Sequence, residues 1–405
     1  MVPADEAVVC TGVGVVSSLG TGKDAFWQAL VEGRSGVAPL SLFEAGDGRW
    51  AVELKDFAPE QILGTKGLRL LDRLTRIALA TASLALQDAG LAEAAPERTG
   101  VVLSSTCGSP ASRSAFYLDA LEAGFRGLNP ALFANTVVNS PASQVAIRFG
   151  LRGPNATVAA GFGGGLDALE YAADLLRAGR AEVVLAGGVE ELGELAFHSF
   201  ERVGLCAPPG PEPPPGPYAR GRRGVLLGEG GAVLVLETAA AARRRGAVPL
   251  AEYAGGATAM QSAVYGRYDG RGQALSTAVQ GALRQSGTAA DDIAWVAAGA
   301  NGALVGDAVE ARVLGATLDR VPAVSASKGA LGETFSAGAA FQAAAAVLGL
   351  MHGAMPPTAG VETVDRRCSI DLAAGKRTPG PVLITADGPL GTAAAGVVRP
   401  VPGTV

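Results

Sequence analysis

The residues with the most distinctive chemistry in this 405-residue chain surround a glycine-rich turn in the stretch TVAAGFGGGLDALEYA, residues 157–172. A short β-type run leads into the turn GFGGG, and an amphipathic helical pattern follows it. Such a turn commonly exposes a nucleophile, because the helix N-terminus offers unpaired N–H groups and a positive dipole. Here the middle of the turn holds Phe162, whose phenyl ring has no reactive group. The sequence therefore has the backbone pattern of a nucleophile site without the nucleophile.

Other candidate nucleophiles and bases are few. The chain has only two histidines, His198 and His352, so a mechanism that needs two imidazoles has to use both. We expect each of them to be structural or to lie on the surface. The GxSxG motif of a serine hydrolase is absent from the turn. The four cysteines are scattered without a CxxC pair, which favours structural thiols: Cys10, Cys107, Cys206 and Cys368.

Cofactor and metal motifs are weak. The N-terminal TGVGVVSSLG nearly fits a dinucleotide-binding glycine turn, but Ser17 stands at the third glycine position. We expect tight turns of a packed α/β sheet there and no cofactor. Metal sites need clustered histidine, cysteine or carboxylate ligands. The cluster Glu190, Glu191 and Glu194 is predicted to be a solvated helix start, so no metal is expected.

Composition excludes several function classes. Hydrophobic residues make up 48% and charged residues 18% of the chain, which is typical of a globular protein. A net charge of −5 gives no reason to expect binding to nucleic acid or to an anionic membrane surface. No apolar run is long enough to cross a bilayer, and MVPADEAVV lacks a basic signal region. We therefore expect a cytoplasmic protein.

The elements that must position the turn alternate along the chain. Short β-branched runs such as VVCTGVGVV, AEVVLAGG and PVLITAD alternate with helical runs such as QALSTAVQGALRQSG. This alternation predicts largely parallel sheets covered by helices. Two similar halves, residues 1–245 and 246–405, fit the pattern better than one very large sheet. The predicted fold class is α/β, with duplicated βαβαβ halves in a five-layer α-β-α-β-α sandwich.

Several segments, in order, resemble the β-ketoacyl synthases of the thiolase-like fold over nearly the whole chain. They are TGVGVVSSLG, RFGLRGPNATVAA, AEVVLAGGVE, GVLLGEGGAVLVLE, GDAVEA, VSASKGALGE and MHGAMPPT. In that family a cysteine lies at the glycine-rich turn and two histidines complete the catalytic set. The resemblance assigns Phe162 to the cysteine position, Gly299 to the first histidine and Glu333 to the second. The lysine of the second histidine motif is kept as Lys328, and the second aromatic of the C-terminal gate is replaced by Pro389.

These replacements remove the chemistry that the family uses. The cysteine thiolate takes the acyl chain, and the histidines assist decarboxylation and stabilise the developing negative charge. Phe162 cannot form a thioester, Gly299 has no side-chain donor, and Glu333 adds negative charge where negative charge develops. Losing even one such group costs orders of magnitude in rate. We expect no independent condensation by this chain; Phe162 is expected to fill the acyl pocket, and Lys328 and Glu333 to neutralise each other.

A subgroup of the family shows this loss: the chain length factors, or ketosynthase β-subunits, of type II polyketide synthases. The resemblance implies a subunit of a β-ketoacyl carrier-protein synthase complex. Its partners would be a ketosynthase α-subunit in a heterodimer, an acyl carrier protein and the growing acyl chain. Members that make aromatic polyketides typically have glutamine where Phe162 stands. This difference leaves room for a reduced, polyene-like or fatty-acyl-like product, and it weakens a role in priming by decarboxylation.

The resemblance also implies which residues line the product tunnel. The helix after TCGSP and the segment NPALFANTVVN lie at the dimer interface in the family. We expect Phe116 and Phe133 to line the tunnel, together with Ser112 and Leu132. Ser112 and Phe116 are four residues apart and so share a helix face. An ordinary core position on that face is the competing interpretation for Phe116.

Two other functions stay open at this point. The chain is either a chain-length-determining subunit or a divergent β-ketoacyl synthase that uses another nucleophile, for which Cys107 and Ser325 are the candidates. The third possibility is a homodimeric scaffold that binds acyl carrier proteins.

Overall fold

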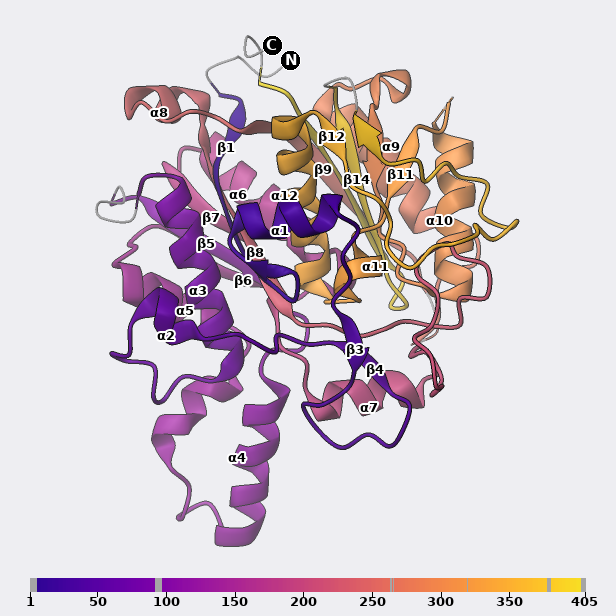
Figure 1. The fold of residues 1–405 in the computed structure, drawn as a ribbon. Coiled ribbons are helices and arrows are strands. Elements are labelled where there is room, and N and C mark those ends of the chain that lie inside the picture. The colour runs from indigo at the N-terminus through magenta and orange to yellow at the C-terminus, as the bar shows by residue number, and fades with distance from the viewer. Residues whose placement is uncertain are drawn as a thin grey trace.

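The computed structural model describes residues 6–91, 97–262, 264, 266–318, 320–376 and 380–401. Its strands form a long mixed sheet that bends around central helices, with the N-terminal half on one side and the C-terminal half on the other (Figure 1). In the described part of the chain, no helix is long and apolar enough to cross a membrane.

The two halves repeat one strand order. The N-terminal half runs β6-β5-β7-β8-β1 and the C-terminal half β11-β10-β14-β15-β9. In each half the first three strands are parallel to one another, and the last two join by antiparallel pairing. The halves meet where β1 pairs with β9. The ten strands are β1 (Val8–Ser17), β5 (Thr99–Ser104), β6 (Asn155–Val158), β7 (Val183–Glu190), β8 (Gly230–Thr238), β9 (Ala251–Met260), β10 (Trp295–Ala297), β11 (Ala323–Ser325), β14 (Val382–Asp387) and β15 (Thr392–Arg399).

Helices cover both faces of each half-sheet, which confirms the predicted five layers. Helices α3 (Arg73–Asp88) and α5 (Ser140–Phe149) pack on the outer face of the N-terminal half, and α9 (Gln273–Ser286) and α10 (Leu304–Thr317) on that of the C-terminal half. Helices α6 (Gly164–Arg177) and α12 (Ser336–His352) form the shared central layer (Figure 1). Helix α12 is rich in alanine and buried on nearly all sides, as a central helix must be.

Smaller elements connect these layers. Helix α1 (Lys23–Val31) covers one end of α12, and α7 (Glu194–Arg202) follows β7. The remaining elements are β2 (Gly20–Thr21), β3 (Val37–Pro39), β4 (Trp50–Val52), α2 (Pro59–Leu63), α8 (Ala239–Arg244), η3 (Ala290–Asp292), α11 (Lys328–Leu331), β12 (Ala354–Met355) and β13 (Gly375–Lys376).

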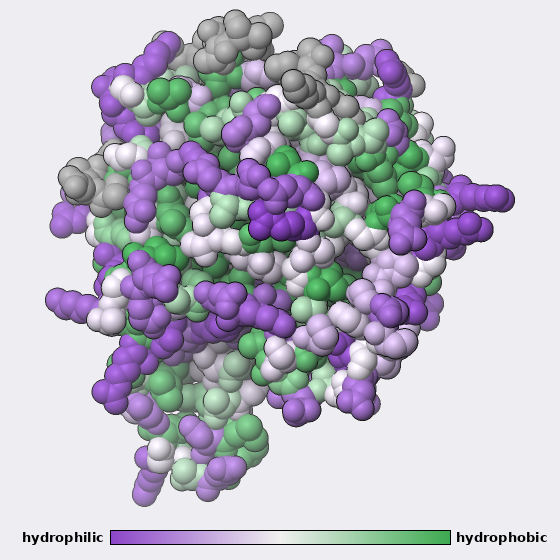
Figure 2. Space-filling view, in the orientation of Figure 1, coloured by the Kyte–Doolittle hydropathy of each residue, from purple (hydrophilic) through white to green (hydrophobic). Residues whose placement is uncertain are grey.

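One helical hairpin projects from the body. It consists of α4 (Pro110–Ala123) and the short helix η1 (Pro130–Thr136), and lies at the bottom of Figure 1. Pro110 is the only buried residue of α4. The hairpin carries large exposed side chains, namely Tyr117, Leu118, Leu121, Phe125 and Phe133. Figure 2 shows hydrophobic surface over this hairpin. Exposed apolar side chains grouped in this way mark a candidate interaction surface.

Candidate functional site

The glycine-rich turn lies between β6 and α6, as the sequence predicts. The turn itself is the short helix η2 (Gly161–Gly163), and α6 begins at Gly164. Gly161 has φ +70°, a conformation that favours glycine. A Cβ at Gly165 would lie 2.6 Å from Ala340 N, so glycine lets α6 approach α12 closely. The backbone therefore has the strand–turn–helix geometry that can present a nucleophile.

Phe162 is the middle residue of this turn, and its side chain is 1% exposed. Its ring centroid lies 5.6 Å from that of Phe335 in an edge arrangement and 6.2 Å from that of Phe200. Phe200 and Phe335 are 4.9 Å apart, so the three rings form one aromatic cluster. Phe162 also packs on the C-terminal gate segment, where a Cβ at Gly388 would come within 3.0 Å of its Cγ. The three rings therefore fill the space around this turn.

Phe335 reaches the cluster at a conformational cost. It has φ +48° and ψ −121° at the start of α12, a region that residues with a Cβ rarely adopt. Its side chain is fully buried. The packing around the rings holds the backbone in this strained conformation.

A buried ion pair lies beside the cluster. Lys328 Nζ is 2.7 Å from Glu333 Oε2, and both side chains are almost fully buried. The same ammonium lies 5.7 Å from the centroid of the Phe162 ring. Asn301 Nδ2 donates to Glu333 Oε2 at 2.7 Å and to the Tyr268 hydroxyl at 2.9 Å. The structure thus brings Lys328, Glu333 and Phe162 together, and the lysine and glutamate neutralise each other.

Gly299 takes part in the site only through its backbone N–H. Its N–H donates to Glu310 Oε1 at 2.8 Å, and Glu310 also accepts from the Thr385 hydroxyl at 2.6 Å. A Cβ at Gly299 would lie 2.8 Å from Thr385 O and 3.0 Å from Ala386 Cα. An imidazole therefore does not fit at this position without a shift of β14.

Sequence reasoning missed several members of the site. Asn301 and Tyr268 complete the polar network, and Asp387 lies at its edge at the end of β14. Burial raises the pKa of Asp387 to about 8, and Glu310 nearby adds to the shift. Desolvation likewise raises the pKa of Asp307 to about 6. These groups come from three separate segments, at residues 268, 301–307 and 387, and a local motif could not have grouped them.

The prediction for the acidic cluster was wrong for two of its three members. Glu190 and Glu191 are buried, with 0% and 2% exposure, and only Glu194 is solvent-exposed at the start of α7. Their side chains accept hydrogen bonds from the segment that leads into α4. A run of glutamates resembles a solvated helix start in sequence, but β7 ends at Glu190 inside the protein.

The gate position and the proposed tunnel residues lie in different elements of the structure. Pro389 is buried in the turn between β14 and β15, and Leu390 beside it faces Gly161. Phe116 and Phe133 lie on the projecting hairpin with ring centroids 5.9 Å apart. Phe133 is 56% exposed, whereas Phe116, Ser112 and Leu132 are half-buried. The hairpin therefore brings the four proposed tunnel residues onto one projecting unit.

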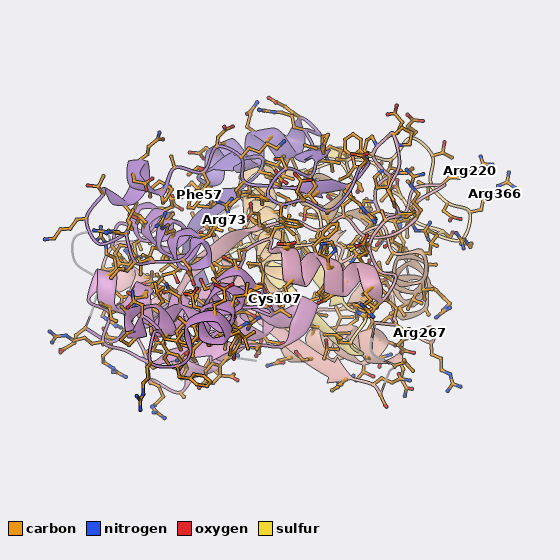
Figure 3. All side chains as sticks on the ribbon, turned by 90° about the horizontal axis from the view of Figure 1, so that it is seen from below. Phe57, Arg73, Cys107, Arg220, Arg267 and Arg366 are labelled. Carbon is orange, nitrogen blue, oxygen red and sulfur yellow. The ribbon has the colours of Figure 1, made fainter. Side chains whose placement is uncertain are left out.

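The alternative nucleophiles have unfavourable surroundings. Cys107 packs against the aromatic cluster, and it is labelled in Figure 3. Burial and the neighbouring Glu190 raise the pKa of the Cys107 thiol well above its usual range. A protonated thiol is a poor nucleophile. Ser325 is buried at the end of β11, and no histidine contact activates it among the described residues.

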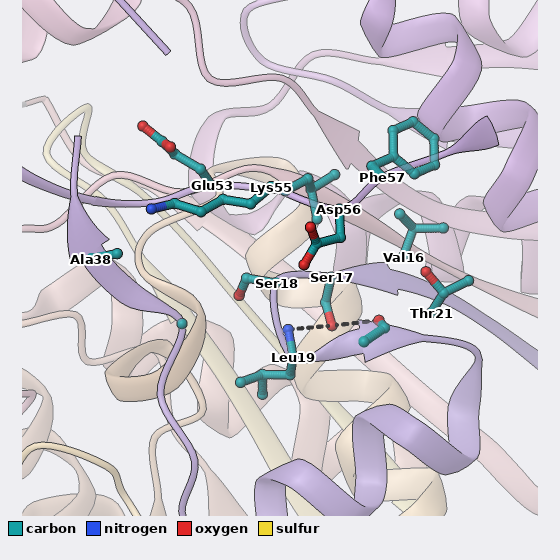
Figure 4. A pocket seen from close by; sticks show the side chains of 13 residues that line it. Val16, Ser17, Ser18, Leu19, Thr21, Ala38, Glu53, Lys55, Asp56 and Phe57 are labelled. Atoms are coloured by element: carbon teal, nitrogen blue, oxygen red, sulfur yellow. Dashed lines mark hydrogen bonds between the residues drawn. The ribbon is translucent and has the colours of Figure 1, made fainter. Parts of the chain in front are cut away.

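The N-terminal glycine stretch does not form a dinucleotide site. TGVGVV belongs to β1, which turns back into β2 as an antiparallel hairpin through Val16 and Thr21. A cavity of about 350 Å³ lies between this hairpin and residues 53–57 (Figure 4). There Ser17 Oγ donates to Gly20 O and accepts from Leu19 N, closing the turn. This geometry lacks the strand-to-helix turn that would bind a pyrophosphate. Within the described residues, no group of histidine, cysteine and acidic side chains could hold a metal ion.

Comparison with known proteins agrees with this architecture. The sequence matches the β-ketoacyl synthase N-terminal domain over residues 5–242 and the β-ketoacyl synthase C-terminal domain over residues 250–362. It is 34% identical to the tetracenomycin polyketide synthase ketoacyl synthase alpha subunit of Streptomyces glaucescens, covering 91% of this chain and 90% of that protein. It is 30% identical to the 3-oxoacyl-[acyl-carrier-protein] synthase 2 of Coxiella burnetii, covering 90% and 91%.

A solved structure supports the fold over the whole chain. The ishigamide ketosynthase/chain length factor superposes with a TM-score of 0.90 at 27% identity, covering 97% of this chain and 99% of the other. The thiolase-like ketosynthase fold, the glycine-rich turn before α6 and the matched domains lead to one conclusion. The chain belongs to the β-ketoacyl synthase family.

Proposed function

We propose that this protein is a non-catalytic, chain-length-determining subunit that pairs with an active ketosynthase. The observation that carries the proposal is the buried phenyl ring at the centre of the glycine-rich turn. Phe162 is buried there in contact with two further rings, and burial raises the pKa of the nearby Cys107 thiol well above its usual range. The chain would shape the space for an acyl chain that grows on the partner's cysteine and is delivered by an acyl carrier protein.

The polar part of the site supports the same proposal. Condensation needs donors that stabilise a developing negative charge. Glu333 offers a carboxylate there, and its nearest ammonium, Lys328, is already bound to it. Gly299 offers no side chain, and the space beside it is closed by β14. With all three groups replaced, the chain lacks the means to form a carbon–carbon bond.

The exposed apolar side chains of the projecting hairpin support the proposal that the chain binds a partner protein. Leu121 and Phe125 at its tip are 83% and 86% exposed. Side chains of this size stabilise a complex by about 1.5–3 kcal/mol each when they become fully buried. We propose that this hairpin enters the heterodimer interface and that Phe116, Phe133, Ser112 and Leu132 face the growing chain there. A related solved structure is a ketosynthase/chain length factor.

A reconstitution experiment tests the proposal. The chain is purified alone and co-expressed with a ketosynthase that has the full Cys-His-His set. Each sample then receives acyl and malonyl donors on the acyl carrier protein. We expect no condensation by the chain alone, and products whose length depends on its presence when the partner is added. Turnover by the chain alone would instead support a divergent synthase.

Native mass spectrometry separates the remaining alternative. We expect a heterodimer with the ketosynthase that forms in preference to a homodimer. A stable homodimer that ignores the ketosynthase and binds acyl carrier protein would support the scaffold function and contradict our proposal.

A further inference from the structure

Two buried carboxylates lie at the end of β7, directly under the root of the projecting hairpin. Glu190 is the last residue of β7, and Glu191 follows it. Burial raises the pKa of each to about 7, and Asp72 adds to the shift of Glu191. Among the described residues, neither carboxylate takes part in a salt bridge. The nearby Arg73, labelled in Figure 3, pairs with Glu229 instead, at 2.7 Å.

Both carboxylates accept hydrogen bonds from the segment that leads into α4, and Glu191 also accepts one from α3. Glu190 accepts from the Ser105 hydroxyl at 3.1 Å and from the Thr106 N–H. Glu191 accepts from the Ser109 hydroxyl at 2.9 Å, and its other oxygen accepts from Leu74 N–H at 3.1 Å. A weaker contact joins it to Ala111 N–H at 3.4 Å.

These contacts join the starts of two helices. Ser109 is the N-cap of α4, and Leu74 lies in the first turn of α3. Glu191 therefore links the first turn of a helix that projects from the protein to the first turn of a helix that packs on the sheet. Pro110 also lies close to Gly193, since a Cβ built on Gly193 would be 3.3 Å from the Cβ of Pro110. The rest of α4 is not buried.

We propose that Glu191, assisted by Glu190, is a positioning residue that fixes the direction in which the α4 hairpin leaves the protein body. An α-helix rises 1.5 Å per residue, so the tip of α4 lies about 20 Å from its root. A tilt of about 10° at Ser109 would then move that tip by roughly 3 Å. Hydrogen bonds to a carboxylate are strong enough to hold this angle. The link from the angle to product length rests on the function proposed above, but the ordering of the hairpin does not.

Amide hydrogen exchange on the isolated full-length chain tests the positioning directly. Glu191→Gln keeps the side-chain shape but places an amide N–H₂ against one of the donors that the carboxylate now accepts. We expect exchange in residues 110–123 to become about tenfold faster, while β7 and the rest of α3 keep their protection. Glu194→Gln, an exposed glutamate three residues further on, is the matched control and should leave exchange unchanged.

A second variant keeps the test informative if Glu191→Gln fails to fold. Ser109→Ala removes the hydroxyl that Glu191 binds and should loosen α4 to a similar degree. The double variant should be little looser than either single variant, because both remove the same contact. Unchanged exchange in α4 of Glu191→Gln, or fully additive effects of the two changes, would overturn the positioning role.

Product analysis with the partner ketosynthase then separates this inference from the proposed function. We expect Glu191→Gln to broaden the distribution of product lengths at a nearly unchanged turnover number. Faster exchange in α4 with an unchanged length distribution would support the positioning role and count against the tunnel assignment of the hairpin. A purely structural defect would lower turnover and protection throughout the protein, and would overturn the inference.

Discussion

At the scale of single residues, Phe162 fills the position where the fold is built to present a nucleophile. The position could be recognised from sequence, because the turn and its flanking strand and helix are local patterns. The rings that contact it could not, since Phe200 and Phe335 come from distant segments. The same holds for Asn301 and Tyr268, which bind near Glu333 only after the chain has folded.

The substitution Phe162→Cys tests whether a thiol at this position is enough to permit condensation. We expect no condensation above background, because Glu333 stays in place and Gly299 has no room for an imidazole. Acyl transfer to the purified variant is measured with radiolabelled acyl carrier protein, with the unaltered chain as control. Robust product formation from this single change would show that the other two replacements matter little.

The Lys328–Glu333 pair makes a prediction about stability. Replacing Glu333 with glutamine leaves a buried ammonium without its counter-charge, which should lower the free energy of unfolding by about 3–5 kcal/mol. The double variant Lys328→Met, Glu333→Gln removes both charges and should recover most of that loss. Urea unfolding of the three proteins measures this. Equal stability of the single and double variants would mean that the pair is not coupled.

At the scale of elements, the alternation of strands and helices was predictable because each has its own hydrophobic period. Strands β7 and β14 and helix α9 all lie where the sequence predicts them. The burial of Glu190 and Glu191 was not predictable, since their partners are in the loop before α4 and in α3. The sequence also contains no signal that α4 would project from the body, because projection depends on what the rest of the protein leaves uncovered.

The hairpin rings give a prediction at this scale. In the complex with a ketosynthase, Phe116→Ala or Phe133→Ala should shift the products to longer chains, because each change removes the volume of a phenyl ring from the proposed tunnel. Mass spectrometry of the released products gives the distribution. Asp119→Ala, an exposed change on the same helix, is the matched control. A ring whose removal leaves the distribution unchanged does not limit the chain.

At the scale of the whole molecule, the repeated strand order shows that the two halves are built on one plan. Alternating periodicity indicated this duplication, and the structure confirms it. The boundary that we propose at residue 245 falls in the connection between α8 and β9. The pairing of β1 with β9 joins the halves and depends on long-range contacts that the sequence does not reveal.

Buried carboxyl groups predict how the stability of the molecule depends on pH. Burial raises the pKa of Asp387 to about 8, of Glu190 and Glu191 to about 7, and of Asp307 to about 6. These groups bind protons more tightly in the folded chain, so their stabilising contribution is complete below about pH 4 and is lost as the pH rises through 6 to 8.

We therefore expect the melting temperature to be roughly 5 °C lower at about pH 8.5 than at about pH 5.5. Thermal denaturation across this range measures the effect. Asp387→Asn mimics the neutral acid and should flatten the decline above pH 7. A melting temperature that rises steadily with pH would contradict the assignment of these groups.

The four cysteines of the chain have a practical consequence for the assembly. Burial raises the pKa of Cys10 and of Cys206 to about 12, of Cys368 to about 11, and of Cys107 further still. Alkylating reagents attack thiolates, so we expect this chain to react only slowly with iodoacetamide at neutral pH. In the proposed heterodimer, the activated thiol of a partner ketosynthase could then be alkylated while both subunits remain together. The label would report on the ketosynthase alone.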